Sequence, residues 1–179
     1  MLFEQVRTGG DRNFGYFLAE GSGGCAAVVD PSGAPELFFE LLDNHRCELK
    51  YVICTHDHHD HTGGIKELAR RSQALIVMHK LTGDRADLPV EDGEVLDLCR
   101  LKLKIIHTPG HTEDCICILA GDILITGDTL FVGKVGGTDL GAGARAEYDS
   151  LHNKILTLPD ETKIFPGHDY GIAPSSTVG

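Results

Sequence analysis

The chain has 179 residues, of which 41% are hydrophobic and 24% charged, an ordinary composition for a globular protein with its own core. Its formal net charge of -11 disfavours nucleic acid as a partner, because binding a phosphate backbone needs a basic surface. The first ten residues lack the apolar stretch of a secretory signal, and no apolar run is long enough to cross a membrane. We therefore expect a single cytoplasmic domain over residues 1–179 with no membrane partner.

The hydrophobic pattern predicts short strands first and then a mixture of helices and strands. Helices are indicated where apolar residues recur at spacings of three and four, as at Leu37, Phe38, Leu41 and Leu42. In chain order, we expect strands over Phe3–Arg7, Phe14–Glu20 and Cys25–Asp30, a helix over Ala34–His45, a strand over Leu49–Cys54, a helix over Ile65–Ser72, strands over Ala74–His79, Leu101–Thr108, Cys115–Leu119 and Ile123–Thr126, a helix over Arg145–Leu158, and a strand over Lys163–Pro166. The mixture favours an α/β fold with two sheets and helices outside them.

The six cysteines do not form a pattern that is typical of a disulfide framework. None of them form a C-x-x-C pair, and several lie in apolar runs such as Cys115–Ile118. We therefore expect all six to be free thiols, mostly buried, in a reducing compartment.

The most informative segment follows the strand that ends at Cys54. Residues Thr55–His61 contain four histidines and two aspartates in seven positions. So many imidazole and carboxylate groups in one short stretch indicate a bound cation, and imidazole nitrogen with carboxylate oxygen suits Zn, Mn or Fe. A solvated polar loop that happens to be rich in histidine is the alternative.

Three later motifs each place a metal-binding residue type just after a predicted strand. These residues are His111 in a Thr-Pro-Gly-His-Thr sequence, Asp128 in Thr-Gly-Asp-Thr, and His168 in Pro-Gly-His-Asp-Tyr. A glycine beside each one lets the backbone turn sharply and aim the side chain. Each residue alone is more typical of a surface or a helix cap, but together with the His-rich segment they indicate one shared site.

This constellation resembles the metallo-β-lactamase superfamily over nearly the whole chain. The resemblance implies a four-layer αββα sandwich with the metal site at one edge of its two sheets. It further implies that one metal is held by His56, His58 and His111, that a second is held by Asp60, His61 and His168, and that Asp128 bridges the two.

The resemblance also implies hydrolytic chemistry with two divalent metal ions, of which Zn is expected first and Fe or Mn are the alternatives. Two neighbouring cations lower the pKa of a shared water, so that a metal-bridging hydroxide can attack a substrate. Asp60 is then expected to orient the nucleophile or accept its proton, and Asp128 to hold the pair of metals together. Both are therefore candidate catalytic residues.

Within the superfamily, the chain is most similar to the glyoxalase II group, which hydrolyses thioesters of glutathione. The similarity lies in Gly127–Gly133 and in Pro166–Tyr170. Asp128 stands where secreted β-lactamases commonly have Cys, and His58 stands where flavodiiron-type oxygen reductases have Glu, which weakens those two branches. The acidic charge weakens a nuclease branch in the same way.

Persulfide dioxygenases are the nearest alternative. The chain resembles them in Gly137–Asp139 and in Leu156–Pro159, and that group holds one Fe(II) with the equivalents of His56, His111 and Asp128. Gly137 departs from the pattern, because that group usually has an arginine there. A non-catalytic metal-binding protein is the alternative from another class.

The partner expected from these features is a small molecule, either a thioester or a glutathione conjugate. Lys134 and Tyr170 are the candidate substrate contacts. Glyoxalase II enzymes have a C-terminal helical region that helps to bind glutathione, whereas this sequence stops at Gly179. This leaves open a substrate without glutathione, a further C-terminal piece, or a homo-oligomer in which a neighbouring subunit completes the pocket.

Overall fold

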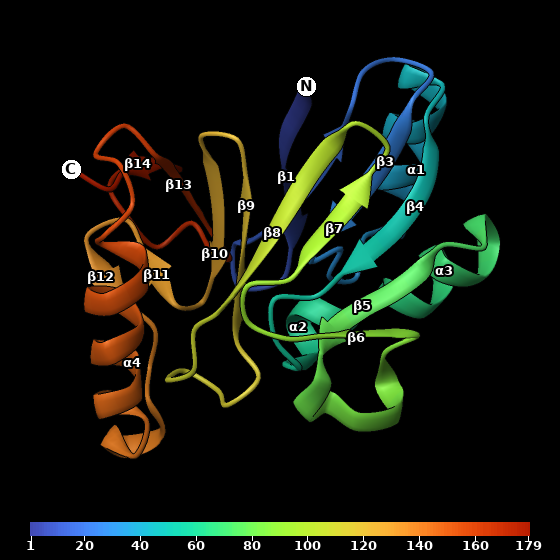
Figure 1. Ribbon diagram of the computed structural model, residues 1–179. Coiled ribbons are helices and arrows are strands. Elements are labelled where there is room, and N and C mark those ends of the chain that lie inside the picture. Colours follow the sequence, from blue (N-terminus) through green and yellow to red (C-terminus); the bar gives the residue numbers. More distant parts are fainter.

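Two six-stranded sheets pack face to face in the computed structural model, which describes all 179 residues (Figure 1). The first sheet has the order β1 (Leu2–Gly9), β2 (Asn13–Ala19), β3 (Cys25–Val29), β4 (Glu48–Ile53), β5 (Leu75–His79) and β6 (Leu88–Val90). The second has the order β14 (Ser176–Thr177), β13 (Lys163–Pro166), β10 (Ile123–Gly127), β9 (Ile116–Ala120), β8 (Leu101–His107) and β7 (Val95–Leu98). A small hairpin of β11 (Leu130–Phe131) and β12 (Lys134–Val135) lies beside the second sheet.

Helices cover the outer face of each sheet. On the first sheet, α1 (Pro35–His45) and α3 (Ile65–Ser72) pack through Phe38, Leu42, Ile65 and Leu68. On the second, α4 (Ala144–Ser150) continues into a π-helical turn, Leu151–Ile155, whose Ile155 packs on the outward residues of β8, β9 and β10. The predicted arrangement of two sheets between helices is therefore confirmed.

The main core lies between the two sheets. Along β2, Tyr16 and Leu18 point into this core, whereas Phe17 and Ala19 point outward to the helices. This follows from the period of two in a strand, because neighbouring side chains lie on opposite faces. Both faces of β2 are covered, which explains why the strand has no polar side chain after Asn13 instead of alternating with polar residues.

Strand direction brings distant parts of the sequence to one edge. Strands β3, β4, β5 and β6 run parallel to one another, and β13 runs parallel to β10. The carboxyl ends of β3 and β4 therefore lie side by side at one edge of the sandwich, and so do those of β10 and β13 in the other sheet. The short helix α2 (His59–Thr62) follows β4 at this edge.

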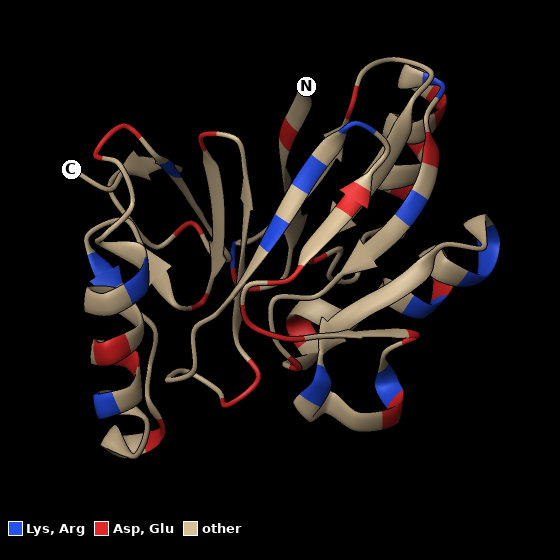
Figure 2. Cartoon of the chain, in the orientation of Figure 1, with Lys and Arg blue, Asp and Glu red and all other residues tan.

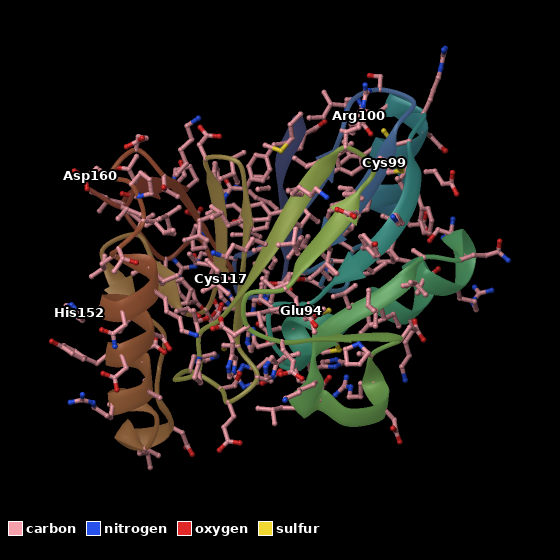
Figure 3. The ribbon with its side chains drawn as sticks, in the orientation of Figure 1. Glu94, Cys99, Arg100, Cys117, His152 and Asp160 are labelled. Carbon is pink, nitrogen blue, oxygen red and sulfur yellow. A yellow bond between two sulfur atoms is a disulfide. The ribbon has the colours of Figure 1, made fainter.

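The prediction that all cysteines are free was wrong for one pair. Cys25, at the start of β3, forms a disulfide with Cys99, in the turn between β7 and β8, although 74 residues separate them (Figure 3). The facing sheets bring these strand ends together, a proximity that sequence spacing does not reveal. Cys47, Cys54, Cys115 and Cys117 are free, and all but Cys47 are buried. None of the helices is both long and apolar enough to cross a membrane.

Candidate metal centre

Strand ends from both sheets deliver the predicted ligands to one edge of the sandwich. The residues after β4 and in α2 carry the His-rich segment, and the loops after β8, β10 and β13 carry His111, Asp128 and His168. The turns at these positions are tight. At Gly127 and Gly167, an added Cβ would lie only 2.5 Å from Thr55 Oγ1 and 2.4 Å from Asp128 Oδ1. Glycine at these two positions therefore lets the ligand-bearing loops approach one another closely.

The seven predicted ligands lie together as two groups of three with one carboxylate between them. In the first group, His58 Nδ1 lies 2.9 Å from His56 Nε2 and 3.1 Å from His111 Nε2. In the second group, His61 Nε2 and His168 Nε2 are 3.2 Å apart, and each lies 3.5 Å from Asp60 Oδ2.

Asp128 contacts both groups. Its Oδ2 lies 3.6 Å from His111 Nε2 and 3.3 Å from His168 Nε2, while Oδ1 lies 3.5 Å from His61 Nε2. The carboxylate is buried, and Oδ1 has no hydrogen-bond partner. A buried carboxylate oxygen without a donor is costly unless a cation neutralises it. The donor set therefore fits a pair of divalent metal ions.

Hydrogen bonds from the outer ring nitrogens orient two of the candidate ligands, His111 and His168. His111 Nδ1 donates to the carbonyl of Gly137 at 2.7 Å, and His168 Nδ1 donates to the carbonyl of Asp11 at 2.8 Å. Because a carbonyl oxygen can only accept, each ring carries its proton on Nδ1 and presents the lone pair of Nε2 to the centre. These contacts fix the orientation of both rings, with Nε2 toward the centre.

Burial and neighbouring charges set the protonation of the other ligands. Burial lowers the pKa of His56 well below its ordinary value, and the surrounding histidines add to this effect. Burial also opposes a charged His61, but Asp30, Asp128 and Asp60 raise its pKa to about 9. Burial raises the pKa of Asp60, yet the Asn13 amide and the nearby histidines leave it lowered overall. At neutral pH and without metal, His56 is therefore neutral and Asp60 is ionised, whereas His61 is protonated and would release this proton to a cation.

Two residues that support the second group were missed by the sequence reasoning. Asp30 is buried and accepts hydrogen bonds from Thr55 N at 2.8 Å and Thr55 Oγ1 at 2.7 Å, and it lies 3.0 Å from His61 Nδ1. Asn13 Nδ2 donates to Asp60 Oδ2 at 2.9 Å. Asp30 follows the apolar strand β3 directly, as the ligands follow theirs, and this signal could have identified it.

A pocket of about 730 Å³ opens beside the first group. It is lined by His58 and His111, by the 109–113 loop, and by residues of the 137–146 segment. The loop after β8 and the loop before α4, which border it, carry acidic residues but no Lys or Arg (Figure 2). Glu147 lies behind the pocket wall, where burial raises its pKa to about 7 against the opposing hydrogen bond from His111 N–H.

The two candidate substrate contacts lie on the other side of the centre. Tyr170 stacks parallel to the ring of His168 with centroids 4.6 Å apart, and Lys134 Nζ lies 4.3 Å from the centre of the Tyr170 ring. Arg12 also lies over this ring, at 4.8 Å. Lys134 and Tyr170 are thus brought together beside the second group, and neither lines the pocket at His58 and His111.

Comparison with known proteins agrees with this geometry. Residues 9–86 and 82–168 match the metallo-beta-lactamase superfamily. The chain is 36% identical over 168 residues to a hydroxyacylglutathione hydrolase of Pelagibacter ubique, covering 88% of this chain and 67% of that relative. It is 35% identical over 185 residues to the mitochondrial persulfide dioxygenase ETHE1 of Homo sapiens, covering 99% and 70% respectively.

The structure is also similar to the crystal structure of ETHE1 from Myxococcus xanthus, with a TM-score of 0.93 at 32% identity, covering 99% of this chain and 80% of that one. The chain spans about two thirds of the length of the two curated relatives. The match extends over most of the sequence and includes every strand that carries a candidate ligand. The chain therefore belongs to the metallo-beta-lactamase superfamily and has its αββα sandwich fold.

Proposed function

We propose that the protein is a metal-dependent thioester hydrolase of the glyoxalase II type. The observation that carries this proposal is the completeness of the second ligand group. Asp60, His61 and His168 converge as closely as the first group does, and separate contacts from Asn13, Asp30 and the Asp11 carbonyl hold them in place. Two supported groups of three candidate ligands suit two metal ions, the number that this type of hydrolase needs.

Two divalent cations in this centre, with Zn expected first, would supply a water nucleophile at neutral pH and polarise the substrate carbonyl. Asp128 would hold both ligand groups at a fixed separation, because its two oxygens face both of them. Asp60 would orient the nucleophile or accept its proton. Its side chain is 46% exposed and is reached by solvent, while the Asn13 amide fixes one carboxylate oxygen.

The substrate that we propose is a thioester of glutathione or of a similar acidic thiol. Arg12 and Lys134 lie over Tyr170 beside the second group, and neither forms an ion pair within the chain. They are therefore available to a substrate carboxylate. The pocket beside the first group has acidic borders and would better accept a neutral acyl group than an anionic one. The thioester would therefore lie across the centre, with its acidic thiol part near Arg12 and Lys134 and its acyl group in the pocket.

Metal analysis and turnover together test the proposal. Protein isolated without added metal should contain about two metal ions per chain by mass spectrometry and release thiol from S-lactoylglutathione. The Asp128→Asn variant should lose this activity, whereas Asp149→Asn, on the exposed face of α4, should keep it. Failure of every thioester to react at any Zn, Fe or Mn loading would refute the hydrolase assignment.

Persulfide dioxygenase activity is the second candidate, favoured by the similarity to ETHE1 over 99% of the chain. It would use a single iron at His56, His111 and Asp128, with positions left open for oxygen and substrate. This function predicts about one iron per chain and oxygen uptake with glutathione persulfide. Two Zn ions per chain without oxygen uptake would exclude it. A protein that binds metal but shows neither activity would support the non-catalytic alternative.

We propose further that the protein resides in the cytoplasm. Four free cysteines, three of them buried, suit the cytoplasm, whereas the Cys25–Cys99 disulfide is more typical of an oxidising environment. Alkylation of the protein inside intact cells, followed by mass spectrometry of Cys25 and Cys99, distinguishes these environments. We expect both residues to be alkylated if the protein resides in the cytoplasm.

A further inference from the structure

One face of the helix formed by α4 and its π-helical turn follows the main chain that leads to His111. Lys154 Nζ donates to the carbonyl of His107 at 2.6 Å, and Ser150 Oγ donates to the carbonyl of Pro109 at 2.8 Å. Glu147 Oε2 accepts the hydrogen bond of His111 N–H at 2.9 Å. The helical residues are three and four positions apart, and each meets every second residue of the extended chain. The helix thus holds this segment along its length.

The contact between the helix and the loop leaves no free space near Glu147. An added Cβ on Gly110 would lie 2.0 Å from Glu147 Oε2, and one on Gly143 would lie 1.9 Å from the carbonyl oxygen of Gly110. Real Cβ atoms do not approach so closely, so glycine at both positions allows direct backbone contact. A displacement of the Glu147 carboxylate would therefore be transmitted to the backbone of His111.

Stability alone does not account for a carboxylate at this place. Glu147 is only 3% exposed, and its Oε1 has no hydrogen-bond partner. No basic side chain forms an ion pair with it, and burial disfavours its charged form. An apolar side chain of similar size would fill the same space at lower cost. The carboxylate is therefore better explained by the one hydrogen bond that it does accept.

We propose that Glu147 is a positioning residue for the metal ligand His111, acting through the main-chain amide of that histidine. Glu147 fixes the backbone, while the Gly137 carbonyl fixes the ring through Nδ1–H, so that both contacts come from the 137–147 segment. Together they direct Nε2 of His111 toward His58 and Asp128. This inference rests on the ligand role of His111 in the proposed function and adds a residue that touches neither metal nor substrate.

Cobalt titration of the metal-free protein tests the assignment. Co(II) is the probe because its visible absorption reports both affinity and coordination geometry. The Glu147→Leu variant fills the volume but cannot accept the hydrogen bond, and we expect it to bind one of the two Co(II) equivalents about tenfold more weakly, with an altered visible band. Glu147→Gln keeps a weaker, neutral acceptor, and we expect a loss of about threefold. Asp149→Leu and Asp149→Asn, two residues further along α4, are the matched controls and should bind as the wild type does.

Thermal unfolding of the metal-free variants separates positioning from simple support of the fold. We expect Glu147→Leu to be as stable as the wild type without metal, or more stable, because a buried carboxylate has been removed. Lower stability with unchanged Co(II) affinity and spectrum would overturn the proposal in favour of a structural role. If the leucine variant does not fold, unchanged Co(II) affinity of Glu147→Gln overturns it instead. Absence of Co(II) binding by the wild type would refute the metal centre itself, a failure that is distinct from these outcomes.

Discussion

The two groups of candidate ligands in the proposed metal centre are supported by different parts of the fold. In the second group, the side chains of His61 and His168 are 0% and 4% exposed, and His61 is held by Asp30 at the end of β3. In the first group, His58 is exposed, and His111 is held by the 137–147 segment. In the group that faces the pocket, His111 thus depends on a loop and a helix, whereas His61 in the second group depends on the end of a sheet strand.

This difference indicates a division of roles between the groups. Groups on sheet ends keep their positions, because opening them would disrupt the core, whereas loops open at low free-energy cost. A substrate that enters the pocket meets the adaptable side of the centre first. We therefore expect the second group to bind its metal more tightly and the first group to respond more strongly to changes outside the core.

The largest effect is expected at Asp128, where the two groups meet. The Asp128→Asn variant removes the charge that both groups share and should lower turnover of the thioester by about 10³-fold, the scale for the loss of a central electrostatic group. Metal content, measured by mass spectrometry, should fall at both positions. Loss of only one metal would show that Asp128 belongs to one group and does not connect them.

A smaller and one-sided effect is expected at Asp30. The Asp30→Asn variant weakens the acceptor that orients His61, and loss of such a partner typically reduces metal affinity about 10–100-fold. The loss should be confined to one of the two metal equivalents in a Co(II) titration. Equal weakening of both equivalents would mean that the groups are not independently supported. Unfolding in the presence of a chelator serves as the control for general destabilisation.

Sequence reasoning identified the candidate ligands, which the structure brings together, but not the residues that support them. Each ligand is a His or Asp that follows a strand, a pattern that lies within a few neighbouring residues. Asn13, by contrast, acts on Asp60 across 47 residues, and Glu147 acts on His111 across 36. Such contacts depend on how the sheets and α4 pack, which no local pattern encodes. Asp30 is different, because it follows its strand as the candidate ligands do, but the proline after it makes it resemble an ordinary turn residue.

The same distinction holds for the fold. The long apolar strands and the helix over Ile65–Ser72 were predicted with the bounds that the structure has, or nearly so. The strands β11, β12 and β14 have two residues each, too few to show any period. The predicted helix Arg145–Leu158 ends at Ser150 as an α-helix and continues as the π-helical turn, a change in winding that leaves the apolar pattern intact.

The free energy of unfolding should depend on pH through Glu147, the residue that supports His111 in the first group. In the metal-free fold, the pKa of Glu147 is raised to about 7, so the folded state binds more protons than the unfolded state between the ordinary pKa and this value. The stability from this group is therefore fully present at acidic pH and is lost as the pH rises through 7. The loss is on the order of 2 kcal/mol.

Urea unfolding of the wild type and of Glu147→Gln, both in the presence of a chelator, measures this contribution. The difference between their free energies of unfolding cancels the effect of the other titrating groups. The difference in the free energy of unfolding should change in favour of the variant as the pH rises from 5 to 8. A difference that is independent of pH would mean that the Glu147 carboxylate is solvated and is not held behind the pocket wall.

The smallest effect is expected at Lys134, which lies beside the second group but outside its ligands. A single exposed ion pair is worth up to about 1 kcal/mol, so Lys134→Ala should raise KM for a glutathione thioester by about fivefold or less and leave kcat unchanged. Added salt should reduce the difference between variant and wild type, because exposed charges are screened. Lys104→Ala, on β8, is the matched control. A fall in kcat with unchanged KM would instead place Lys134 at the reacting atoms. The second group would then depend on residues outside the core as strongly as the first group does.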